Sequence, residues 1–132
     1  MRAIFRSIHG SLNHLLLTDG AIWYPRYTQG PVTRLPLDAE LEGDRTVLAS
    51  RLTAATARWS GYVARLDDAA LAGDLRYIMT TGQSLALPVS GALLHVFNHA
   101  THYQGQITAA ISMLGFAYQP LDLPFLIFSE RA

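Results

Sequence analysis

A chain of 132 residues with ten basic and ten acidic residues carries no net charge, so no overall positive field draws it to nucleic acid or to an anionic membrane. Half of the residues are hydrophobic and 15% are charged, which excludes a disordered chain and favours one compact domain over residues 1–132. All ten basic residues are arginines and there is no cysteine, which excludes a lysine Schiff base, a disulfide and a thiolate metal site.

The cellular location of the protein is predicted from its apolar segments. The opening residues lack the long apolar run of a signal peptide, and no later stretch is long enough to cross a bilayer. We therefore expect a soluble cytoplasmic protein with neither nucleic acid nor membrane as a partner. Without cysteine, any metal ion must be held by imidazole nitrogens and oxygen ligands.

The first predicted element is a long helix over residues 3–24. Its apolar residues recur at spacings of three, four and seven, and it has no internal proline. We expect this helix to stop near Pro25. Residues 27–37 hold a glycine and two prolines among polar residues and are predicted to form a connecting loop.

A second helix is predicted from about residue 39 to about residue 66. Asp38 is a good N-cap, and Glu40 and Glu42 bring negative charge into the first turn. Apolar residues then follow at helical spacing. Residues 67–73 are expected to form a turn with one short helical piece.

The C-terminal half is predicted to hold a small β-hairpin and a third long helix. Residues 75–80 and 84–87 flank a Thr-Gly-Gln turn and form the hairpin. The helix covers residues 89–114 and ends before Gly115. The apolar, proline-broken tail at 121–128 is expected to pack across the body or against a second subunit.

The third helix carries the only sharp chemical signal of the sequence. At about 100° per residue, His95, His99, His102 and Gln106 share one narrow arc, with Tyr103 at its edge. Most other positions of this helix are apolar, so the polar stripe is expected to face a buried or half-buried surface. Stacked imidazoles on such a surface are costly without partners, and a metal ion is a partner that uses them well.

A site on this stripe needs a ligand from a neighbouring helix. His14 of the first helix is the candidate, and His9 is a weaker one because it lies about 140° from His14 around the same helix. The alternative interpretation is structural: a single helical histidine is more often a hydrogen-bonded core or surface residue than a ligand. The sharing of one arc by several imidazoles favours the metal site.

Two histidine motifs resemble the signature of the DinB-like family of metal-binding four-helix proteins. One is the Asn98-His99 run over residues 95–107, and the other is Asn13-His14 within residues 11–16. Further similarity lies in Asp19, Trp23, Arg76, Tyr77 and the Leu-Asp-Leu-Pro tail at 121–124. The resemblance covers almost the whole chain and implies an all-α, up-and-down helical bundle of the DinB/YfiT-like type, often dimeric.

The resemblance also implies a divalent metal, zinc or nickel, held by three histidines. Some members transfer small thiols or isomerise thiol conjugates, using the metal to lower the pKa of the thiol, and the family name does not imply DNA binding. Carried over, the implied ligands are His14 and His99. The usual third histidine is replaced by Tyr103, and Gln104 stands where arginine is usual.

Three outcomes are open for the third ligand position. His102 rotates in as ligand, Tyr103 binds as a phenolate, or the site has lost its metal and kept a polar core. Tyr ligation requires the metal to drive proton loss, since a phenol has a pKa of about 10. We favour His102, with Asn98 and Gln106 as supporting hydrogen-bonding residues.

Relatives also have a helix before the one that contains His14, which this chain is expected to lack. Three long helices would leave an apolar face exposed, so we expect a homodimer. Two functions follow as hypotheses. One is a metalloprotein that activates a water or a small thiol substrate, as a thiol transferase or hydrolase-type enzyme. The other is a degenerate member without catalysis, serving as a structural or binding protein.

Overall fold

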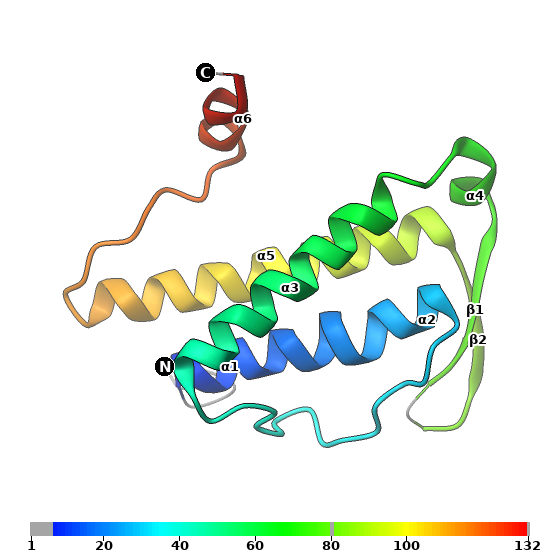
Figure 1. Cartoon of the computed structure of the whole chain (residues 1–132), viewed down its shortest axis with the longest axis horizontal. Coiled ribbons are helices and arrows are strands. Elements are labelled where there is room, and N and C mark those ends of the chain that lie inside the picture. The colour runs from blue at the N-terminus through cyan, green and yellow to red at the C-terminus, as the bar shows by residue number, and fades with distance from the viewer. Residues whose placement is uncertain (1–6, 80, 132) are drawn as a thin grey trace.

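The structure is a computed structural model that describes residues 7–79 and 81–131 (Figure 1). One continuous helical run consists of α1 (Ile8–Leu15), the π-helix η1 (Leu16–Trp23) and α2 (Tyr24–Thr28). It is followed by α3 (Arg45–Val63), α4 (Asp68–Ala72), β1 (Asp74–Ile78), β2 (Ser84–Pro88), α5 (Val89–Met113) and α6 (Leu123–Arg131). Residues 3–6 of the predicted first helix and residue 80 of the predicted hairpin lie outside the described residues.

The first helical run does not stop at Pro25, as the sequence had suggested, and it ends only at Thr28. Pro25 has no backbone N–H to donate to the carbonyl of Ala21. That carbonyl accepts instead from the backbone N–H of Thr33, at 3.1 Å. Because the loop supplies the missing donor, the proline is tolerated inside the run. The run ends where Gln29 takes a left-handed conformation with φ 59°.

The second long helix begins at Arg45 rather than near residue 39, and its N-cap is Asp44 instead of Asp38. The Asp44 carboxylate accepts from the backbone N–H groups of Thr46 and Val47. The preceding residues cannot join the helix because the buried side chain of Asn13 takes up their backbone groups. A long-range contact therefore overrides a good local capping signal.

The hairpin, the short helical piece and the third long helix are confirmed. β1 pairs antiparallel with β2, and Gly82 in the turn has φ 89°, a conformation that favours glycine. α5 ends with Gly115 at φ 80°. The N–H of Gly115 donates to the carbonyl of Ser112, and that of Phe116 donates to the carbonyl of Ile111. These two hydrogen bonds together form the Schellman motif of a helix C-terminus.

The apolar tail differs from the expectation that it packs across the body. From residue 123 the tail forms α6, which lies apart from the three long helical segments in Figure 1, whereas Leu121 lines a pocket with residues of α1, α3 and α5. Leu123, Phe125, Ile127 and Phe128 are all exposed. Their exposure leaves the alternative prediction, a contact with a second subunit, in place.

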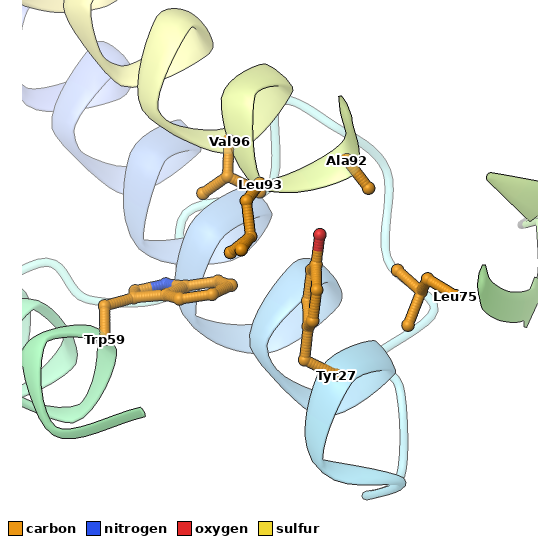
Figure 2. Packing of buried hydrophobic residues seen from close by; sticks show 6 residues of the cluster. All are labelled: Tyr27, Trp59, Leu75, Ala92, Leu93 and Val96. Atoms are coloured by element: carbon orange, nitrogen blue, oxygen red, sulfur yellow. The ribbon is translucent and has the colours of Figure 1, made fainter. Parts of the chain in front are cut away.

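The core lies between the first helical run, α3 and α5. The α1–η1 segment contacts α3 and α5, so it lies between them in the packing. Figure 2 shows one cluster in which Trp59 of α3 and Tyr27 of α2 meet Leu93 and Val96 of α5. The Tyr27 hydroxyl donates to the carbonyl of Val89 at 3.2 Å, which ties α2 to the start of α5.

The predicted all-α class is confirmed in its main feature, since the described chain is mostly helical with one small hairpin. In the described ranges, no helix is long and apolar enough to cross a membrane. The up-and-down bundle and the absence of a first helix stay predictions.

Candidate functional site

Two histidines predicted as ligands meet between α1 and α5. His14 is buried with 4% of its surface exposed, and its Nε2 atom lies 3.4 Å from the Nε2 atom of His99. The Nδ1 atom of His14 donates to the backbone carbonyl of Leu37 at 2.8 Å, because a carbonyl can only accept. A neutral His14 therefore presents a lone pair on Nε2 toward His99.

Asn13 explains why the Leu37 carbonyl lies where His14 needs it. The Asn13 amide is buried, and its Oδ1 accepts from the N–H groups of Leu41 and Glu42 at 2.8 and 2.9 Å. Its Nδ2 donates to the carbonyl of Glu42 at 3.0 Å. The Asn-His pair thus works as a unit: Asn13 anchors the loop, and the loop orients His14.

A carboxylate lies on the other side of the histidine pair. The Nδ1 atom of His99 is 3.6 Å from Oδ1 of Asp19, and it is buried with no hydrogen-bond partner among the described residues. The single hydroxyl hydrogen of Thr18 is shared between the carbonyl of His14, at 2.9 Å, and the same Asp19 oxygen, at 3.2 Å. The order of groups is therefore carbonyl, His14, His99, carboxylate.

This chain of groups is not satisfied by two neutral imidazoles. If His99 carries its hydrogen on Nδ1, two Nε2 lone pairs face each other across 3.4 Å. If it carries the hydrogen on Nε2, a lone pair faces the Asp19 carboxylate. One additional positive charge, a proton or a metal ion, resolves both conflicts. The arrangement is thus suited to holding a cation.

Asp19 reaches the site because it lies in the π-helix η1. π-helical turns are uncommon and occur often at functional sites. The carbonyl of Asp19 accepts from the N–H of Tyr24 and from the indole Nε1 of Trp59, the latter at 3.0 Å. Trp59 is buried in the core, so α3 anchors the widened turn that carries the carboxylate.

The surroundings keep His14 neutral. Burial lowers the pKa of His14 below its ordinary value, with a smaller lowering from the nearby His99, while the Leu37 hydrogen bond and Asp19 act in the opposite direction. Burial and His99 also lower the pKa of His95. A neutral imidazole is the form that binds a metal.

Tyr103 lies against both histidines. Its ring centroid is 4.6 Å from that of His14 and 4.8 Å from that of His99, and its side chain is 7% exposed. Burial raises the pKa of the Tyr103 hydroxyl, which favours the neutral phenol. The residue at the usual third-ligand position is therefore inside the site.

His102 and His95 are less close to this pair than the predicted stripe implied. His102 is exposed, and its Nε2 atom lies 2.7 Å from the Nε2 amide of Gln106, which donates to it. His95 is also exposed, with its ring 5.7 Å from that of His99. The expectation that the whole stripe faces a buried or half-buried surface is wrong, because His95 and His102 are exposed. Tyr103 is buried, and His99 and Gln106 are half-buried.

The described residues hold no group of three or more His, Cys, Asp or Glu side chains that could bind a metal ion together. Of the four predicted metal residues, His14, His99 and Tyr103 meet, while His102 pairs with Gln106. The role of Asp19 was missed. At regular helical spacing it lies about 140° from His14, and only a π-helical turn brings it beside the site.

The comparisons with known proteins found one family match. A model of the DinB family matches residues 1–132. No curated protein and no solved structure was found to match the chain.

Proposed function

The chain belongs to the DinB family, and on that premise we propose that it is a metal-dependent protein whose His14 and His99 bind a divalent ion, zinc or nickel. The main support for this proposal is that the Nε2 atoms of the two histidines lie 3.4 Å apart. The other ring nitrogen of His14 faces a carbonyl, and that of His99 faces a carboxylate. When bound, the ion supplies a Lewis acid that lowers the pKa of a water or of a small thiol substrate. The proposed class is a cytoplasmic thiol transferase or hydrolase-type enzyme.

The donor set supports a metal ion. Two imidazole nitrogens on one tetrahedral zinc ion lie roughly 3.3 Å apart, since each Zn–N bond is about 2.05 Å long. The Nε2 atoms of His14 and His99 are separated by 3.4 Å, so they need no large movement. Metal-bound histidines usually have a carbonyl or carboxylate at the other ring nitrogen, as Leu37 and Asp19 are placed to provide.

The third ligand is proposed to be Tyr103 rather than His102. The Tyr103 ring already contacts both imidazoles, whereas His102 is exposed and accepts from Gln106. Burial keeps the phenol neutral until a cation is present, so the binding of the ion and the loss of the Tyr103 proton are expected to be coupled.

The substrate is proposed to enter beside Asp19. A pocket of about 410 Å³ is lined by Asp19, Phe97 and Gln104 together with apolar residues of α1, α3 and α5. Its volume is in the range of small-molecule sites. The chain would bind the apolar part of a thiol there and orient it by the polar groups at the edge, while Thr18 holds the Asp19 carboxylate toward His99.

A second candidate function is a non-catalytic structural or binding protein. Tyr103 in place of the usual histidine favours it, as does the lack of a three-residue ligand group among the described residues. In that case the positive charge between His14 and His99 is a proton.

Metal content measured on protein purified with and without added zinc or nickel distinguishes the two functions. We expect about one ion per chain in the wild type, loss of the ion in His14→Ala and His99→Ala, and retention in the matched control His9→Ala, whose imidazole faces Glu40 instead. Chelation should lower the melting temperature of the wild type, because a ligand of the folded state raises stability. Equal metal content in all four proteins would contradict the proposal.

The third ligand has its own test. Tyr103→Phe is expected to weaken metal binding and His102→Ala to leave it unchanged, as measured by competition with a chromogenic chelator. Tyr103→His should strengthen it by restoring a third imidazole. If His102→Ala weakens binding and Tyr103→Phe does not, the exposed histidine is the ligand.

We also propose that the helices form the up-and-down bundle of the family and that two chains form a homodimer through α6. A groove of about 1260 Å³ between α1, α3 and α5 is lined by apolar residues such as Leu12, Leu48 and Ile107. The exposed apolar side chains of α6 are suited to cover the groove of a partner. Light scattering should give a dimeric mass for the wild type and for the control Val63→Asp and a monomeric mass for Phe125→Asp. A monomeric wild type at micromolar concentration would exclude the dimer.

A further inference from the structure

Three arginines line one pocket beside α2 and β1. Arg26 comes from α2, Arg34 from the loop that follows, and Arg76 from β1. The pocket has a volume of about 400 Å³ and is lined further by Gln29 and Tyr77. Residues distant in the sequence therefore bring three positive charges to one concave surface.

These charges have no acidic partners in the described part of the chain. No Asp or Glu lines the pocket, and none of the three arginines takes part in an ion pair there. The chain as a whole has no net charge, so the concentration of positive charge is local. Like charges in one pocket repel, and an anion that neutralises them would relieve this cost.

Arg26 is held in place for such a role. Its guanidinium carbon lies 4.6 Å from the centre of the Trp23 ring and 4.3 Å from that of Tyr77, so the group lies over two aromatic rings that contact each other edge to face. Its Nε atom is buried and has no hydrogen-bond partner among the described residues. A guanidinium held by two aromatic rings loses little freedom when it binds an anion.

We propose that this pocket binds a dianionic small molecule, a phosphomonoester or a dicarboxylate. Arginine binds a phosphate or a carboxylate through two parallel hydrogen bonds. Three guanidinium groups suit a ligand with two negative charges better than a ligand with one. A small molecule is favoured over a nucleic acid because the pocket is concave and the chain carries no net positive charge to track a phosphate backbone.

The site is separate from the histidine pair but lies near it. The Trp23 ring that supports Arg26 also contacts His95, whose ring lies next to that of His99. An anionic group in the pocket would thus anchor one end of a molecule whose other end approaches the histidines. Anion binding in this pocket requires no metal ion, so its presence or absence leaves the proposed metal site unaffected.

In the test, the protein is titrated with inorganic phosphate, with succinate and with a short oligonucleotide at an ionic strength held constant with sodium chloride. Binding is measured by the melting temperature and by isothermal calorimetry. We expect saturable binding of at least one dianion and weaker binding of acetate. Arg34→Gln and Arg76→Gln should each weaken the binding at least about tenfold, since each removes a charged hydrogen bond. The control Arg65→Gln changes an exposed arginine outside the pocket and should bind as the wild type does.

The two arms distinguish the source of the anion, because a preference for phosphate indicates a phosphomonoester and a preference for succinate a dicarboxylate. Both exposed arginines can be changed without disturbing the stacked Arg26, so both variants should fold. The proposal is overturned if neither dianion binds beyond the chloride control. It is also overturned if Arg65→Gln weakens binding as much as Arg34→Gln, or if only an oligonucleotide binds.

Discussion

Replacing Asn13 by alanine should release the loop that orients His14. The Asn13 side chain makes three hydrogen bonds to backbone groups of Leu41 and Glu42, at 2.8, 2.9 and 3.0 Å. The residue is 1% exposed, so water cannot replace these bonds without opening the structure. A fourth bond, from Asn13 Nδ2 to the carbonyl of His9, is longer at 3.2 Å. At roughly 1 kcal/mol net for each bond, the loss amounts to about 3–4 kcal/mol of unfolding free energy.

The assay is urea unfolding followed by circular dichroism, with the free energy taken by linear extrapolation. A loss of that size lowers the melting temperature by about 10 °C in a domain of this length. Asn98→Ala is the matched control, because Asn98 is an exposed asparagine on α5 without a hydrogen bond of its side chain in the described chain, and it should lose less than about 0.5 kcal/mol.

A second readout separates a local from a global effect. Arg34 is exposed in the loop, so trypsin can cut after it when the loop leaves the helices. Cleavage there should be faster in Asn13→Ala than in Asn98→Ala under conditions where both remain folded. Equal unfolding free energies and equal cleavage rates in the two variants would refute the reasoning and mean that other contacts hold the loop.

Three further predictions follow from burial and backbone geometry. Burial lowers the pKa of His14 below its ordinary value of about 6.5, so the unfolded chain binds the proton at a higher pH than the folded chain does. In the presence of chelator, the unfolding free energy should therefore fall as the pH drops below about 6.5. Urea midpoints should show this pH dependence in the wild type and lose it in His14→Gln. Gly105→Ala should raise stability by about 0.5–1 kcal/mol, because a Cβ there meets nothing within 4 Å, whereas Gly82→Ala should lower it by about 1–2 kcal/mol because φ is 89°; thermal melts that rank the two variants the other way would contradict this. Trp59→Phe should cost about 1–2 kcal/mol in urea unfolding through the lost bond to the Asp19 carbonyl and the smaller ring, and a loss below 0.5 kcal/mol would show that this bond does not anchor the π-helix.

The parts of the fold that depend on local signals were predictable from the sequence. The end of α5 follows from Gly115, because glycine adopts the left-handed conformation that closes the helix without the steric cost of a Cβ atom. The hairpin follows from two short apolar runs around Gly82. In both cases the deciding groups lie within a few residues of one another, so the sequence contains the whole cause.

The two helix boundaries that were predicted wrongly depend on residues that are distant in the sequence. Asp38 and Asp44 are equally good N-caps by local criteria, and the choice between them falls to Asn13, which is far away in the sequence. Pro25 stays inside the helical run because Thr33 supplies a donor for the carbonyl that the proline leaves without one. Both outcomes require a contact that no helical period reveals.

In the candidate site, too, some residues were predictable from the sequence and others depend on packing between distant segments. Helical periodicity grouped His99 with His102, yet the packing of α1 against α5 selects His99 and Tyr103 and leaves His102 exposed. Periodicity gives the direction of a side chain on its own helix, but it does not say which part of the arc the neighbouring helix covers. The Asn-His motif of α1 was the stronger guide because His14 comes from that neighbour.

The π-helix η1 accounts for the one functional group that the sequence pattern concealed. A regular helix would turn Asp19 away from His14, and the His99 Nδ1 atom would then be buried without a carboxylate beside it. The widened turn carries Asp19 to within 3.6 Å of that atom, and the indole of Trp59 holds the turn through the Asp19 carbonyl. The core residue Trp59 therefore acts on the chemistry at a distance: it fixes the backbone that supplies the negative charge, and this charge makes a cation between the two histidines favourable.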